Sequence, residues 1–220
     1  MTALIGKEDA TAIDRLFRAG LVGQVGLILF TSNQGCLYCA ETRSLLEEIS
    51  SLTDKVRLEV VDIENERARA GEMGVDLAPT TVVVATNGAR LHYVGMPAGN
   101  QLRSLVEDIV DASRGRFEMD EEARATIRRV RAETTIKVFV TPSCRYSPLV
   151  VRSAHRFALE NPLISALMIE TVEFPQLAER YGVVGVPRTV INDSVAFDGA
   201  PTEKAFAEKV LEASTGPTRP

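Results

Sequence analysis

Apolar and polar positions recur along the chain with two periods, and the same order of periods occurs twice. Apolar residues spaced three and four apart predict amphipathic helices, whereas short apolar runs bounded by turn residues predict buried strands. The predicted order in each half is helix, strand, helix, strand, short helix, strand, strand, helix. This order is typical of an α/β fold in which each half has a mixed central sheet with helices on both faces.

The periodicity also gives boundaries for the main elements. Asp9 and Asp120 are predicted N-caps, because a carboxylate there accepts hydrogen bonds from free backbone N–H groups. In the first half we expect helices over 9–18, 40–51 and 101–112 and strands over 25–30, 56–62 and 80–85, with a turn at 87–88. In the second half we expect helices over 120–132, 149–159 and 203–213 and strands over 136–140, 166–170 and 189–191, with a turn at 192–193.

One constant offset in residue number relates the two halves. It connects three pairs of residues in the same order along the chain: Cys36 with Cys144, Gly74 with Gly182, and Pro79 with Pro187. Two repeats of domain length indicate a duplicated globular domain, because a solenoid has shorter and more numerous units. We therefore expect two tandem domains, residues 1–115 and residues 116–220.

The charge pattern excludes some classes of partner. The net charge of −5 comes from acidic and basic residues interleaved along predicted helices, without a basic stripe that would follow a phosphate backbone, so we expect no nucleic-acid partner. We expect no membrane association, because no apolar run has the length of a bilayer span. The segment Met1–Phe17 lacks the pattern of a secretory signal, so the expected location is the cytoplasm.

Cys36-Leu37-Tyr38-Cys39 is the strongest chemical motif in the chain. It follows a predicted buried strand and precedes a helix, which is the context in which a C-x-x-C motif is redox-active. If Cys36 occupies the helix cap, the two side chains reach disulfide distance and the helix dipole stabilises a Cys36 thiolate. We therefore expect Cys36 to be the nucleophile and Cys39 to attack the resulting mixed disulfide.

The chain resembles the protein disulfide oxidoreductases with two tandem thioredoxin folds, also described as glutaredoxin-like proteins. The resemblance covers nearly the whole chain and is clearest over 105–115, 138–146 and 185–192. It implies a redox-active Cys36–Cys39 disulfide and a cis-proline facing each motif, at Pro79 and Pro187. We expect no bound cofactor besides this disulfide. Ser147 departs from the family pattern, because it stands where the second cysteine of the second motif belongs.

The cis-proline that the resemblance implies also suggests where substrate binds. A cis bond would let Ala78 offer its backbone to an extended substrate segment beside Cys36. We therefore assign substrate binding to Ala78 and Pro79, together with Leu37 and Tyr38 of the motif.

Cys144 has two interpretations. It is either a reactive monothiol, similar to the Cys-x-x-Ser of monothiol glutaredoxins, or a relic in a unit kept for structure or substrate docking, and the sequence favours the relic. A zinc site would need Cys144, His92 and His155 to join the C-x-x-C motif, and these residues lie far apart in the expected fold, so we predict no metal.

Two acidic residues end equivalent strands. Asp62 and Glu170 are candidates for assisting proton transfer, although such carboxylates are more often solvated. The strand before Cys36 carries no acidic residue, so the sequence leaves the proton acceptor for Cys39 open.

The expected function is a thiol–disulfide oxidoreductase that reduces disulfides in other proteins. A flavin-dependent thioredoxin reductase is the expected electron source, because the chain has no flavin or nicotinamide motif. Two alternatives remain: a dedicated electron donor to a peroxidase, as similar tandem modules are in the hydroperoxide-reductase system, and a binding module whose dithiol senses redox state.

Overall fold

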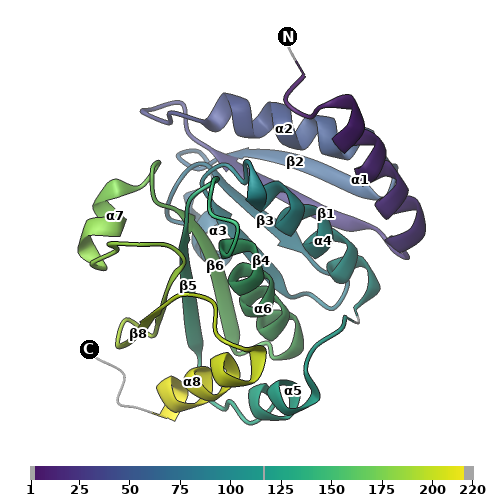
Figure 1. The fold of residues 1–220 in the computed structure, drawn as a ribbon. Coiled ribbons are helices and arrows are strands. Elements are labelled where there is room, and N and C mark those ends of the chain that lie inside the picture. The colour runs from purple at the N-terminus through teal and green to yellow at the C-terminus, as the bar shows by residue number, and fades with distance from the viewer. Residues whose placement is uncertain (1–2, 116, 216–220) are drawn as a thin grey trace. The chain divides into compact units, whose positions relative to one another are not determined.

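The computed structural model of the chain describes residues 3–115 and 117–215 (Figure 1). It divides into two compact units, Met1–Met96 with Leu105–Arg116 and Pro97–Ser104 with Phe117–Pro220. The division falls within one helix, α4 (Asn100–Arg114), whose larger part belongs to the first unit. Each unit is described separately below.

The first unit is built around four strands. Its elements besides α4 are α1 (Lys7–Gly20), β1 (Val25–Thr31), α2 (Cys39–Ser51), β2 (Val56–Asp62), α3 (Arg67–Glu72), β3 (Thr80–Val84) and β4 (Arg90–Val94). The strand order is β2-β1-β3-β4. Because β1 pairs in parallel with β2 and antiparallel with β3, the sheet is mixed, as predicted.

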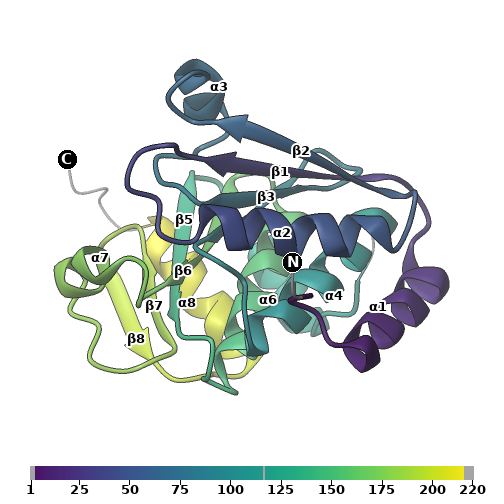
Figure 2. The ribbon, with the colours of Figure 1, turned by 90° about the horizontal axis from the view of Figure 1, so that it is seen from above.

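Helices cover both faces of this sheet. Four consecutive residues of β3, Thr80–Val83, are buried, and successive side chains of a strand point to opposite faces. Figure 2 shows α3 on one side of these strands and α2 on the other. The N-terminal segment reaches α2 through the backbone N–H groups of Leu4 and Ile5, which donate to Glu48.

The helices are amphipathic. In α4, Leu105, Ile109 and Ala112 are fully buried, whereas Arg103 and Arg114 are exposed. This spacing of three and four residues is the period from which the helix was predicted. Within residues 3–115 and 117–215, no helix has the length and apolar character that crossing a membrane requires.

The second unit repeats the same plan. Its elements are α5 (Glu121–Ile127), β5 (Thr134–Val140), α6 (Ser147–Glu160), β6 (Ile164–Glu170), α7 (Pro175–Arg180), β7 (Arg188–Ile191), β8 (Val195–Asp198) and α8 (Glu203–Thr215). The strand order is β6-β5-β7-β8, with β5 parallel to β6 and antiparallel to β7. Figure 1 shows α7 on one side of these strands and α5, α6 and α8 on the other.

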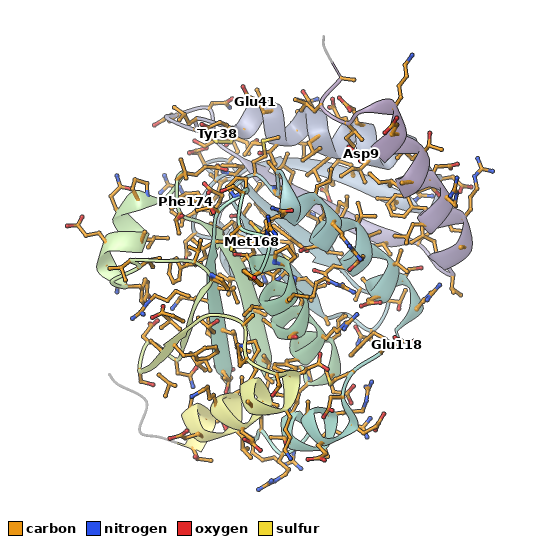
Figure 3. The ribbon with its side chains drawn as sticks, viewed as in Figure 1. Asp9, Tyr38, Glu41, Glu118, Met168 and Phe174 are labelled. Atoms are coloured by element: carbon orange, nitrogen blue, oxygen red, sulfur yellow. A yellow bond between two sulfur atoms is a disulfide. The ribbon has the colours of Figure 1, made fainter. Side chains whose placement is uncertain are left out.

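Of the two predicted N-caps, Asp120 and Asp9, only Asp120 was correct. Asp120 caps α5 by accepting a hydrogen bond from the Ala123 N–H, as predicted. Asp9 is not a cap: α1 begins at Lys7 after Gly6, and Asp9 lies in the first turn, where its charge favours the helix dipole. Figure 3 shows Asp9 on this helix.

Helix α5 ends at Ile127, earlier than predicted, because the buried Asn161 side chain donates hydrogen bonds to carbonyl groups at the helix end and just after it. The Asn161 amide donates to the carbonyl oxygens of Ile127 and Val130 at 2.9 and 3.1 Å. Its own carbonyl oxygen accepts from the Leu163 N–H at 3.0 Å. Asn161 therefore connects the end of α5 to the turn before β6.

Replacing Asn161 with alanine is expected to lower the free energy of unfolding by about 2–3 kcal/mol, because buried backbone groups lose their partners. Urea denaturation measures this change. The matched control is Asn65→Ala at an exposed position, which should change stability by less than about 0.5 kcal/mol. Equal effects of the two substitutions would contradict the assigned role of Asn161.

Candidate active site

Cys36 lies in the turn that follows β1, and Cys39 is the first residue of α2. The two form a disulfide, with their Cα atoms 5.6 Å apart. Cys36 is partly exposed, whereas Cys39 is only 8% exposed. Of the two cysteines, Cys36 is therefore the more exposed.

The predicted position of Cys36 on the helix was wrong. Helix α2 begins at Cys39, with Tyr38 as its N-cap, and the first helical hydrogen bond runs from the Thr42 N–H to the Tyr38 carbonyl at 2.9 Å. Cys36 therefore precedes the cap by two residues and does not occupy it. Figure 3 shows Tyr38 and Glu41 at this end of α2.

A polar group that the sequence did not reveal lies beside Cys39. The backbone N–H of Ser32 donates to the Cys39 sulfur at 3.3 Å. The Ser32 hydroxyl contacts Glu64 Oε1 at 2.6 Å and accepts from the Gln34 N–H at 2.9 Å. The other carboxylate oxygen of Glu64 is buried and has no hydrogen-bond partner among the described residues. Ser32 thus connects the inner sulfur to a carboxylate.

The strand register explains this contact. Thr31 and Asp62 are paired at the ends of the parallel strands β1 and β2, so the residues that follow them, including Ser32 and Glu64, lie at the same edge of the sheet. Glu64 could have been proposed from the sequence only if this pairing had been known.

The two strand-end acids accept hydrogen bonds from the turns that follow their strands. Asp62 accepts from the backbone N–H groups of Glu64 and Asn65, both at 3.0 Å, so it stabilises the turn after β2. Glu170 is buried and accepts from the Glu173 N–H at 2.7 Å, so the expectation of a solvated carboxylate there was wrong.

The proline of the first unit lies at the same end of its sheet as the dithiol. The Ala78–Pro79 bond is cis, as the resemblance implied. Thr80, which begins β3, pairs with Phe30 near the end of β1. The Pro79 carbonyl accepts a hydrogen bond from the Gly95 N–H at 2.8 Å. Leu37, within the C-x-x-C motif, is 78% exposed.

The second unit has an equivalent arrangement with one cysteine. Cys144 follows β5 and is partly exposed, and its thiol donates to the Val186 carbonyl at 3.5 Å. The Val186–Pro187 bond is also cis. Ser147, the first residue of α6, is completely buried.

The candidate zinc ligands do not form a cluster. Across the two described ranges, no group of three or more His, Cys, Asp and Glu side chains is placed to hold a metal ion. His92 lies on β4 and its Nε2 contacts the Met73 carbonyl at 2.8 Å, while His155 is buried in the middle of α6.

Comparisons with known proteins agree with this geometry. The family model "Thioredoxin domain" matches residues 134–212. A thioredoxin from Methanocaldococcus jannaschii is 36% identical over 80 residues, which are 36% of this chain and 94% of that protein. The crystal structure of a protein disulfide oxidoreductase from Aeropyrum pernix has a TM-score of 0.87 and 29% identity, covering 95% of this chain and 93% of that one.

A longer relative matches the chain over only part of its own length. An alkyl hydroperoxide reductase protein from Xanthomonas campestris pv. phaseoli is 22% identical over 173 residues, which are 77% of this chain and 30% of that protein. The chain therefore spans less than a third of this relative. Taken together with the Cys36–Cys39 disulfide in its C-x-x-C motif, these matches show that the chain belongs to the thioredoxin-like family of thiol–disulfide oxidoreductases.

Proposed function

We propose that the chain reduces disulfides in other proteins through Cys36 and Cys39. The observation that supports this most strongly is the unequal exposure of the two cysteines that follow β1: Cys36 is partly exposed and Cys39 is buried. A protein substrate is too large to reach the buried sulfur. It therefore meets Cys36 first, and Cys39 is held for an intramolecular second step.

The reaction starts from the reduced dithiol. The Cys36 thiolate attacks one sulfur of the substrate disulfide, so that a bond forms between the two sulfurs and the other substrate sulfur leaves as a thiolate. Cys39 then loses its proton and attacks the Cys36 sulfur. The second substrate sulfur leaves with its electron pair, and the chain is left with the Cys36–Cys39 disulfide seen in the structure.

Substrate binding is assigned to Ala78 and Pro79, with Leu37 and Tyr38. The Pro79 carbonyl is already bonded to Gly95, which leaves the backbone of Ala78 as the group offered to an extended segment. The exposed Leu37 side chain adds apolar contact. Such a site recognises main chain more than side chains, so it accepts many substrates.

Glu64 acts as a positioning residue for the second step. Its carboxylate holds the Ser32 hydroxyl, and Ser32 directs its N–H at the Cys39 sulfur. A donor in that place stabilises negative charge as Cys39 is deprotonated.

Glu64→Ala is expected to slow the release of the mixed disulfide about fivefold, the effect of one hydrogen bond of about 1 kcal/mol. Glu64→Gln keeps an oxygen that accepts from Ser32, so it should retain most of the rate. Stopped-flow measurement of substrate release checks both variants, with Glu41→Gln at an exposed position of α2 as control. Equal losses in the alanine and glutamine variants would show that the charge of Glu64 acts, and not its hydrogen bond.

The proposed setting follows from the chemistry. The oxidised pair needs a source of two electrons, which we assign to a flavin-dependent thioredoxin reductase, and no cofactor besides the disulfide is proposed. The partners are disulfide-containing proteins, the location is the cytoplasm, and the two tandem domains are residues 1–115 and 116–220.

Insulin reduction tests the proposed function. With dithiothreitol as electron source, the chain should accelerate the precipitation of insulin B chains in proportion to its concentration. A rate no higher than with dithiothreitol alone would favour the second candidate, a dedicated electron donor to a peroxidase, which the match to an alkyl hydroperoxide reductase protein supports. It would equally fit a redox-sensing binding module, and reduction of a purified peroxidase separates these two alternatives.

A further inference from the structure

Cys144 is the third cysteine of the chain, and the reaction proposed above does not use it. It lies in the turn between β5 and α6, with its sulfur 3.5 Å from the Val186 carbonyl and next to the cis-Pro187 bond. Its place in the second unit corresponds to that of Cys36 in the first. The site is therefore built like a thioredoxin-fold active site but holds a single thiol.

The residue in place of the second cysteine is a buried serine. Ser147 is completely buried, and its Oγ has no hydrogen-bond partner in the described part of the chain. A buried hydroxyl without a partner is destabilising. A sulfur anion at Cys144 supplies the acceptor that Ser147 lacks.

The surroundings favour the thiolate of Cys144. Burial raises the pKa of this thiol, but the Ser147 hydroxyl and the backbone N–H groups of Tyr146 and Ser147 lower the pKa by more. The balance is a pKa below the ordinary value of a cysteine, which increases the thiolate fraction at neutral pH.

The residues on the neighbouring segments are apolar and exposed. Leu149 on α6, Val172 after β6 and Val184 before β7 are 62%, 67% and 95% exposed. Their counterparts in the first unit, at the offset that relates Cys36 to Cys144, are all acidic: Glu41, Glu64 and Asp76. The segment after β6 lies at the Cys144 end of the sheet, because the Thr171 N–H donates to the carbonyl of Val140, the last residue of β5.

We propose that Cys144 is a second thiol–disulfide exchange site, which attacks a disulfide in an apolar polypeptide segment and retains that segment as a mixed disulfide. The Cys144 thiolate forms a bond with one sulfur of the partner. The partner's own disulfide breaks, and its other sulfur leaves as a thiolate that takes a proton from water. The partner's disulfide is thus the oxidant.

The adduct should be long-lived because Ser147 has no sulfur with which to displace the partner. Release needs a thiol from outside the site. The second unit would therefore capture a partner, whereas the first unit turns substrates over. This inference does not depend on the proposed function, since it uses neither Cys36 nor Cys39.

The test uses the full chain with Cys36→Ser and Cys39→Ser, in which Cys144 is the only thiol. The oxidised wild-type chain, whose other two cysteines are joined, serves as a second preparation if the variant is unstable. The probes are mixed disulfides of thionitrobenzoate with the peptide Val-Ile-Cys-Val-Ala, with the acidic peptide Glu-Asp-Cys-Glu-Ala, and with glutathione. Release of the yellow thionitrobenzoate ion gives the rate, and mass spectrometry identifies the adduct.

We expect one thionitrobenzoate to be released per chain, with the peptide bonded to Cys144 and stable after excess probe is removed. The apolar peptide should react about fivefold faster than the acidic peptide or glutathione, the effect of burying one or two methyl groups. Val184→Asp, which introduces the residue type of the first unit, should remove this preference.

Two further variants separate capture from simple thiol reactivity. Ser147→Ala should slow the reaction several-fold, and Ser147→Cys should release the peptide and leave an intramolecular disulfide. A rate equal to that of the chain unfolded in urea would overturn the proposal. It would also be overturned if glutathione reacted as fast as the apolar peptide, because the apolar residues would then not select the partner.

Discussion

Replacing Cys36 with serine is expected to abolish the reduction of protein disulfides. A large substrate is expected to reach the sulfur of Cys36 and not that of Cys39. Cys39 is only 8% exposed and is the first residue of α2. A serine hydroxyl is not ionised at neutral pH and does not attack a disulfide. The insulin assay should therefore give the rate of dithiothreitol alone.

The matched control for this prediction is Cys144→Ala. It removes a thiol of similar exposure from the second unit and should keep most of the activity, because one thiol without a resolving partner does not turn substrates over. Substantial insulin reduction by the Cys36→Ser chain, or loss of activity in Cys144→Ala, would mean that the working thiol was assigned to the wrong unit.

Replacing Cys39 with serine is expected to convert the enzyme into a trap. The first attack by Cys36 remains possible, but the intramolecular attack that normally follows is lost, and its effective concentration far exceeds that of an external thiol. Steady-state reduction should fall at least about a hundredfold, while covalent complexes with substrate accumulate.

Non-reducing electrophoresis after incubation with a disulfide-bonded protein measures this trapping. The complexes should disappear on addition of excess dithiothreitol, and those that are bonded to Cys36 should not form when Cys36 is replaced as well. Any complexes that form with the Cys36→Ser, Cys39→Ser chain would be bonded to Cys144. They can therefore be distinguished from the complexes of Cys36. A Cys39→Ser chain that turns over like wild type would contradict the assigned order of attack.

The sequence predicted the element order and the dithiol because both depend on local patterns. The pattern of apolar residues predicted both end residues of the strand Val56–Asp62 correctly. The constant offset between the halves related Cys36 to Cys144 without knowledge of any contact. Spacing alone also indicated the Cys36–Cys39 pair, since residues three apart at a helix start come within disulfide distance.

What the sequence did not predict depends on pairing between distant segments. The contact of Ser32 with Glu64 follows from the register of β1 and β2, and the early end of α5 follows from Asn161, which comes far after Ile127 in the chain. Cys36 was placed on the helix cap because the motif directly precedes the predicted helix. The helix begins only at Cys39, so exposure and not cap geometry distinguishes the two sulfurs.

A single-turnover experiment tests the central claim most directly. The fully reduced chain, freed of reductant, is mixed with insulin under anaerobic conditions, and thiols are alkylated and mapped by mass spectrometry. The account predicts that each chain loses two thiols, those of Cys36 and Cys39, now joined as a disulfide, while insulin gains two and Cys144 stays alkylated. Insulin that remains oxidised while Cys36 and Cys39 are both alkylated would contradict it.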